Sequence, residues 1–107
     1  MPSYFLTLDS FARFDPAAAT KADVARGEQL FAGLNCFEAG QGQRVHAHAG
    51  ADKFYLVLRG KARMSVGDEV AVAVAGDLLW APAGVPHGVL EALERTVLLV
   101  AMAPPPG

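Results

Sequence analysis

Short apolar runs separated by glycine, proline and aspartate recur along the chain from Gln29 onward. Such runs, several of them rich in valine, leucine or aromatic residues, are typical of the strands of a β-sandwich or barrel. Gly67 begins a Gly-Asp pair between two runs, which predicts a tight hairpin with a positive φ, and Gly60 is expected to act similarly one hairpin earlier. The pattern predicts strands at residues 29–38, 43–48, 53–59, 61–66, 69–74, 77–81, 87–91 and 95–102.

The pattern before Gln29 is less regular. Residues 4–8 have the character of an edge strand, whereas Asp15, Pro16 and Gly27 are residues that favour the start and end of a short helix. An ordered arm lying on the barrel is an equally good interpretation of this Ala-rich stretch. We expect one domain over 1–107, with an N-terminal arm or helix at 1–28, a barrel at 29–103 and a loose tail at 104–107.

Composition supports a single globular domain and limits its partners. Apolar residues make up 52% of the 107 residues and charged residues 19%, which is enough to fold one core but leaves no room for a second. The formal net charge is -2, so no strong basic field exists to attract nucleic acid or an anionic membrane. The lone Cys36 cannot form an internal disulfide and is expected to pack in an apolar strand. Without a leader or an apolar run of membrane-spanning length, we expect a cytoplasmic protein.

The three histidines are the strongest candidates for chemistry. His46 and His48 are two residues apart, so on one strand their imidazoles would share a face, about 6.5 to 7 Å apart. His87 follows the stiff turn at 82–86, and inward side chains of neighbouring strands converge in a small barrel. Three imidazoles favour zinc, iron, nickel or copper over manganese. The alternative is that the histidines are core residues satisfied by local hydrogen bonds.

A wider pair of motifs includes these histidines, and it reads Gly40-x5-His46-x-His48-x4-Lys53-x6-Gly60 and Gly76-x5-Pro82-x-Gly84-x2-His87. Over residues 40–87 they resemble the two motifs of the cupin superfamily. The resemblance implies an all-β antiparallel jelly-roll barrel, usually a homodimer, that often holds one divalent metal. It implies His46, His48 and His87 as metal ligands, but this chain has Lys53 where the family has a glutamate ligand.

Lys53 is therefore an unusual candidate catalytic residue. An ammonium about 4 Å from a divalent ion meets about 8 kcal/mol of repulsion at an effective dielectric of 20. Lys53 should turn away, lose its proton, pair with Asp52 or Glu91, or face a site without metal. It would bind a substrate carboxylate or act as a general base; the alternative is a surface lysine. By strand parity, Tyr55 and Val57 should face the cavity with it.

The sequence supports two candidate functions. The resemblance implies a metal-dependent dioxygenase or isomerase acting on a small organic acid or phenol. The alternative is a non-enzymatic barrel that binds or senses a small ligand without metal, with Lys53 in place of the glutamate, and a purely structural barrel stays open as a third. Strands 53–59 and 95–102 are apolar on both faces, which predicts a homodimer. The aromatic residues Phe37, Phe54 and Trp80 are expected to fill the core.

Overall fold

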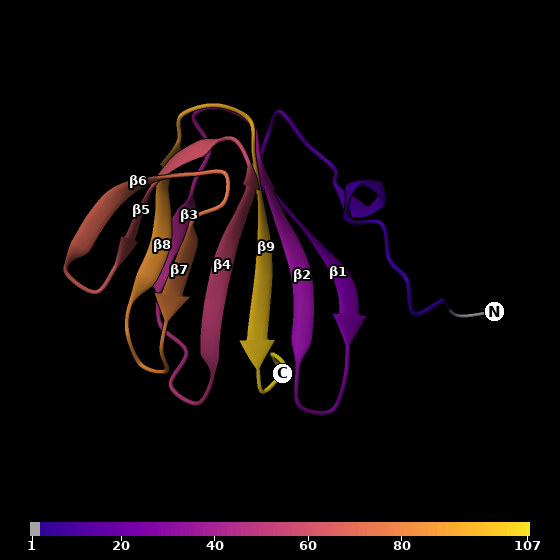
Figure 1. Cartoon of the computed structure of the whole chain (residues 1–107). Helices are drawn as coiled ribbons and strands as arrows, with labels where there is room; N and C mark the ends of the chain where they lie inside the picture. The colour runs from indigo at the N-terminus through magenta and orange to yellow at the C-terminus, as the bar shows by residue number, and fades with distance from the viewer. Residues whose placement is uncertain (1–2) are drawn as a thin grey trace.

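The computed structural model describes residues 3–107, which form an almost entirely β architecture (Figure 1). Within these residues, no helical segment has the length and apolar character needed to cross a bilayer. A short 3-10 helix, η1 (Leu8–Phe11), precedes the strands. The strands are β1 (Thr20–Arg26), β2 (Phe31–Phe37), β3 (Gln43–His46), β4 (Asp52–Arg59), β5 (Lys61–Val66), β6 (Glu69–Val74), β7 (Leu78–Ala81), β8 (His87–Ala92) and β9 (Thr96–Ala103).

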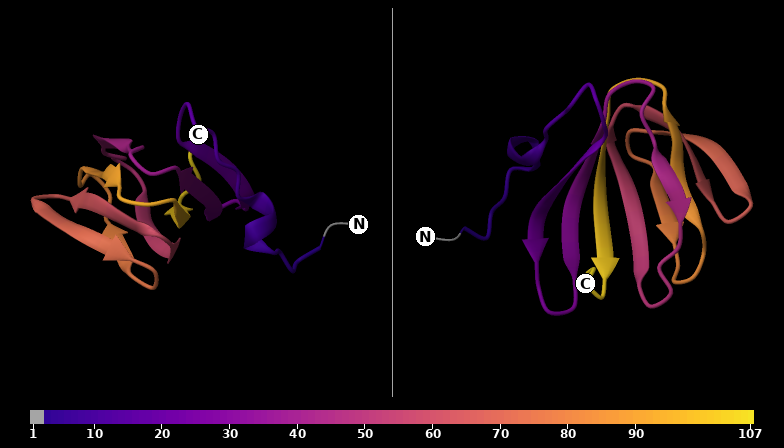
Figure 2. Two further views of the ribbon diagram at one scale, coloured as in Figure 1. Left: turned by 90° about the horizontal axis from the view of Figure 1, so that it is seen from above. Right: turned by 180° about the vertical axis from the view of Figure 1, so that it is seen from behind.

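The strands form two antiparallel sheets that face each other, as the views in Figures 1 and 2 show. One sheet has the order β1-β2-β9-β4-β7 and the other β3-β8-β5-β6. Their inner faces interdigitate around a core to which both sheets contribute. This arrangement confirms the predicted all-β jelly-roll barrel. The core contains Phe37, Tyr55, Val57, Ala62, Met64, Ala73, Val89, Ala92, Leu98 and Val100.

The strands predicted from Gln29 onward are all present, as β2 to β9, with bounds that differ by no more than two residues. Both predicted turn glycines have a positive φ, of 96° at Gly60 and 59° at Gly67. At Gly60 a Cβ atom would lie only 2.3 Å from the carbonyl oxygen of Arg95. A side chain is therefore excluded there by space as well as by backbone conformation.

The N-terminal region forms neither the predicted helix nor the predicted edge strand, whereas the alternative of an ordered arm lying on the barrel is confirmed. No helix forms over 15–27; instead β1 pairs antiparallel with β2, from Thr20 opposite Cys36 to Arg26 opposite Phe31. Backbone pairing with an existing sheet edge outweighs a weak local helix signal, because tertiary context overrides propensity. Residues 4–8 form no strand, since β1 already occupies that edge of the sheet, and the chain enters η1 at Leu8.

The N-terminal segment instead covers part of the outer face of the larger sheet. Phe11, Ala12 and Phe14 pack against a cluster formed by Leu34, Cys36 and Val97. Cys36 is 1% exposed, which confirms its expected packing role. The chain's own arm therefore provides some of the cover that the sequence assigned to a partner subunit.

Trp80 is a correction to the predicted core. It is 54% exposed on β7, where its cross-strand partner is Phe54. The next residue, Ala81, is buried, so the alternation along this short strand turns the small side chain inward and the large one outward.

Candidate metal centre

His46 and His87 lie directly opposite each other, at the end of β3 and the start of β8. The register shifts between Gln43 and His46, which is the signature of a β-bulge, a feature that redirects side chains. The close approach of the two strands depends on Gly88, because a Cβ there would lie 2.8 Å from Cα of Val45. Glycine next to His87 thus lets two distant stretches bring their imidazoles together.

His48 lies just beyond β3, in the segment that leads to β4. Its carbonyl oxygen accepts a hydrogen bond of 2.9 Å from the amide of Gly84. The carboxylate of Asp52 accepts a second, also of 2.9 Å, from the amide of Ala83. These two bonds fasten the turn that precedes His87 to the segment that carries His48, and so fix both histidines against each other.

The three imidazoles form one compact group. Ring centroids are 4.9 Å apart for His46 and His48, 4.6 Å for His46 and His87, and 5.7 Å for His48 and His87. One ring nitrogen from each lies within 4.8 Å of the others. Nitrogens bound to one tetrahedral ion at about 2.0 to 2.1 Å are separated by about 3.4 Å. Small rotations of the side chains therefore suffice to close the group around a metal.

In His46 and His87, a hydrogen bond to the backbone determines which ring nitrogen is available to bind a metal. Nδ1 of His46 lies 2.8 Å from the carbonyl oxygen of Arg44, and Nδ1 of His87 lies 3.0 Å from that of Val85. A carbonyl only accepts, so each Nδ1 carries the proton and each Nε2 presents a lone pair. Backbone carbonyls orient metal-binding histidines in this way.

Nε2 of His87 is the most informative atom of the group. It is buried and, within the described residues, has no hydrogen-bond partner. Burial lowers the pKa of His87, although the bond to the Val85 carbonyl acts in the opposite direction. Burial, and to a smaller extent the charge of Lys53, also lowers the pKa of His48. Neutral imidazoles with free lone pairs fit a metal ion, and an orphaned buried acceptor is otherwise unfavourable.

Lys53 points into the barrel and not to the surface. Its side chain is 6% exposed, and Nζ lies 4.9 Å from the centroid of the Tyr55 ring. Burial, together with the nearby charge of Lys21, lowers the pKa of Lys53 to about 8. Tyr55 and Val57 are buried on the same side of β4, which confirms the predicted parity.

Neither carboxylate proposed as a partner for Lys53 pairs with it. Asp52 is the neighbour in sequence and therefore points to the opposite face of β4, where it holds the amide of Ala83. Glu91 lies on the exposed face of β8, and its carboxylate is 3.4 Å from the guanidinium of Arg63. Of the four options left open for Lys53, pairing with Asp52 or Glu91 is therefore not the one that the structure shows.

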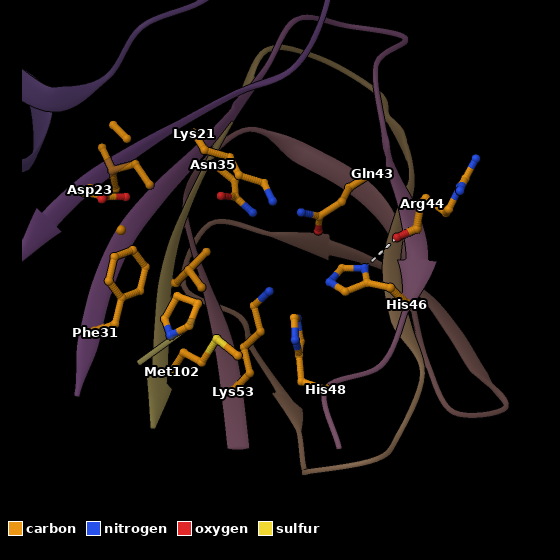
Figure 3. Close-up of a pocket in the computed structure, with 15 residues that line it drawn as sticks. Lys21, Asp23, Phe31, Asn35, Gln43, Arg44, His46, His48, Lys53 and Met102 are labelled. Carbon is orange, nitrogen blue, oxygen red and sulfur yellow. Dashed lines mark hydrogen bonds between the residues drawn. The ribbon is translucent and has the colours of Figure 1, made fainter. Parts of the chain in front are cut away.

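A cavity of about 450 Å³ opens beside the histidines (Figure 3). His46, His48 and Lys53 line it, while His87 lies deeper and is 1% exposed. The cavity also contains polar residues that spacing alone did not identify. These are Lys21 and Asp23 of β1, Asn35 of β2, and Gln43 and Arg44 of β3. Of these residues, only Asn35 could have been identified from the sequence, because it is a polar residue inside an apolar run.

Comparisons with known proteins agree with the fold and the motifs. The cupin domain family matches residues 33–102. An uncharacterized protein of Streptomyces coelicolor is 32% identical over 80 residues, which is 75% of each chain. The crystal structure of TT1209 from Thermus thermophilus has a TM-score of 0.90 and 38% identity, covering 97% of this chain and 100% of that one. An RmlC-like cupin protein from Desulfovibrio desulfuricans has a TM-score of 0.82 and 33% identity over 99% of both chains. With its two sheets, its histidine group and a family match over most of its length, the chain belongs to the cupin superfamily as a small single-domain member.

Proposed function

We propose that the protein binds one divalent transition metal through His46, His48 and His87. The observation that carries this proposal is the buried Nε2 of His87, which has a lone pair and no hydrogen-bond partner among the described residues. Imidazole nitrogens suit zinc, iron, nickel or copper. With three protein ligands, such an ion keeps open positions at which it can polarise an oxygen ligand or lower the pKa of a bound water.

The cavity supports an enzymatic role on a small oxygen-containing molecule. It adjoins the histidines, and its walls combine polar groups with Phe31, Val100 and Met102. A dioxygenase or isomerase acting on a small organic acid or phenol is the function class that we propose. Lys53 is the candidate catalytic residue, since its ammonium reaches the same cavity and can bind an anionic substrate or transfer a proton at Nζ.

Metal analysis of protein purified without an affinity tag tests the metal centre. We expect about one equivalent of transition metal per chain, and a large loss of binding in the variant His48→Gln, which removes one of the two half-buried ligands. Glu91→Gln, on the outer face of β8, is the matched control and should keep its metal. Less than about a tenth of an equivalent, with no recovery when metal is added, would refute the proposal.

The buried position of Lys53 supports a second candidate function, that of a barrel that binds a small ligand without metal. Its buried ammonium opposes a nearby dication, and the two functions differ in what Lys53→Glu should do. If the native site holds a metal, the substitution strengthens an affinity that already exists. If the variant binds metal tightly while the native protein binds none, the metal-free function is correct.

We also propose that the protein is a homodimer. Large apolar side chains are exposed on the adjoining edges of the two sheets, and such a patch in a small protein usually marks an interaction surface. A second copy is the partner that a symmetric oligomer provides. The patch comprises Val70, Val72 and Val74 of β6 with Leu78 and Trp80 of β7, each between 43% and 56% exposed.

A further inference from the structure

The cavity beside the histidines carries a local excess of positive charge. Its lining contains three cationic side chains, Lys21, Arg44 and Lys53, and one anionic side chain, Asp23. The whole chain has a formal charge of -2, so this lining does not follow from overall composition. A concave surface of one charge sign with low-dielectric walls concentrates ligands of the opposite sign. The cavity therefore favours anions.

Lys53 is the cation that most needs a counter-charge. It is 6% exposed, whereas Lys21 and Arg44 are exposed. Among residues 3–107, no carboxylate oxygen lies within 4.0 Å of its Nζ. The face of the Tyr55 ring, 4.9 Å away, replaces an anion only in part. A buried ammonium without an anionic partner is unfavourable, and a bound anion would relieve this.

Two side-chain amides add hydrogen-bond donors around the same space. The Tyr55 hydroxyl donates to Oε1 of Gln43 at 2.9 Å, which leaves the Gln43 amino group directed into the cavity (Figure 3). Asn35 is 6% exposed and lines the same cavity. In Figure 3 these amides and the ammonium of Lys53 border the same open space. Converging donors match a carboxylate, which has two acceptor oxygens and no donor.

An apolar wall begins directly beside Lys53. Met102 of β9 lies opposite both Lys53 of β4 and Phe31 of β2, so the three residues form one row across the sheet. Val100 lines the cavity in the next inward-facing row. A ligand that uses this wall must carry an apolar body next to its charged group. The volume of about 450 Å³ fits a small molecule of this kind.

We propose that the cavity binds a small carboxylic acid through Lys53, with Asn35 and Gln43 as additional donors, and that Lys53 selects carboxylates over phenols. The inference rests on the proposed function, because His46 and His48 line the same cavity and would hold the metal beside the bound acid. The carboxylate of such an acid can contact the ammonium of Lys53, while a neighbouring hydroxyl or keto oxygen can contact the metal. Hydroxy acids and keto acids are therefore the substrate class.

Calorimetric titration of chelator-treated, metal-free protein with benzoate and benzamide tests the carboxylate site. The two probes share a shape, but only benzoate is charged. We expect benzoate to bind at least about tenfold more tightly than benzamide. Lys53→Met should weaken benzoate binding by about tenfold or more and leave benzamide binding unchanged. The matched control Lys61→Met, which removes an exposed lysine of β5, should change neither affinity.

Equal affinity of the native protein for benzoate and benzamide would overturn the inference, and this comparison needs no variant to fold. Unchanged benzoate affinity in a folded Lys53→Met protein would do the same, as would inorganic phosphate binding as tightly as benzoate. Because the titration uses metal-free protein, it is independent of the metal analysis. Failure of the carboxylate site and failure of the metal centre are therefore distinguishable.

Discussion

Lys53 combines two properties that ordinarily conflict, a positive charge and an interior position. The side chain is 6% exposed and faces the cavity that His46 and His48 line. A protonated Lys53 and a dication in the same cavity would repel each other, and an anionic ligand between them would attract both. Metal binding and carboxylate binding should therefore strengthen each other, since coupling between two ligands is reciprocal.

The buried charge of Lys53 also predicts how stability depends on pH. The pKa of Lys53 falls from 10.5 to about 8 in the folded state, so the folded protein releases this proton first as pH rises. Between these two values the unfolded chain binds more protons, and stability increases with pH. Below about pH 8 Lys53 is protonated in both the folded and the unfolded state. Its burial then lowers the unfolding free energy by about 3 kcal/mol.

Chemical denaturation of metal-free protein between pH 7 and pH 10 measures this effect. We expect Lys53→Met to be more stable than the native protein near pH 7, by about 2 to 3 kcal/mol, with the difference shrinking as pH rises from about 8. Lys61→Met controls for the loss of an exposed lysine. Parallel stability curves for the native protein and Lys53→Met would contradict the prediction.

The contact between β3 and β8 is the element-scale feature on which the metal centre depends. Its residues come from stretches far apart in sequence, and the bulge before His46 places that ring opposite His87. Gly42 and Gly88 both lie where a Cβ would meet the facing strand, at 2.7 Å from the Val89 oxygen and 2.8 Å from Cα of Val45. Two strands with ordinary side chains at these positions could not approach so closely.

Gly88→Ala should therefore separate β3 from β8. We expect a loss of about 1 to 3 kcal/mol of unfolding free energy from overpacking, together with weaker metal binding because His46 moves away from His87. Gly50→Ala is the matched control, since a Cβ there would meet no atom within 4 Å. Thermal denaturation and metal titration of both variants provide the measurements. Native metal affinity in Gly88→Ala would show that the close approach is not needed.

Local patterns predicted the elements well where each strand carried its own signal. β5 and β6 have the predicted bounds because alternating residues and the turn at Gly67 are local features. β1 was not predicted, since TKADVAR contains few residues that favour strands and depends on pairing with β2. The histidines were identified by spacing, but Lys21 and Asn35 reach the cavity only through the register of β1 and β2. Register across strands is a non-local property that spacing does not contain.

At the scale of the whole molecule, the cavity and the apolar patch occupy separate surfaces. The residues that line the cavity belong to β1, β2, β3, β4, β9, the segment after β3 that carries His48, and the C-terminal tail, where Arg26 donates a hydrogen bond to the Pro106 carbonyl. The patch lies on β6 and β7, and none of its residues lines the cavity. A second copy bound at the patch would leave the cavity accessible, so assembly and ligand binding should be independent.

Trp80→Lys tests this separation together with the homodimer. Light scattering of the native protein at micromolar concentration should give twice the mass of one chain, and Trp80→Lys should shift the mass toward the monomer, since a charge inside an apolar interface is strongly unfavourable. Leu30→Lys, a similarly exposed apolar position outside the patch, should stay dimeric. Metal content per chain should be the same in all three proteins. A monomeric native protein would refute the dimer, and metal lost with the dimer would instead show that assembly supports the histidine site.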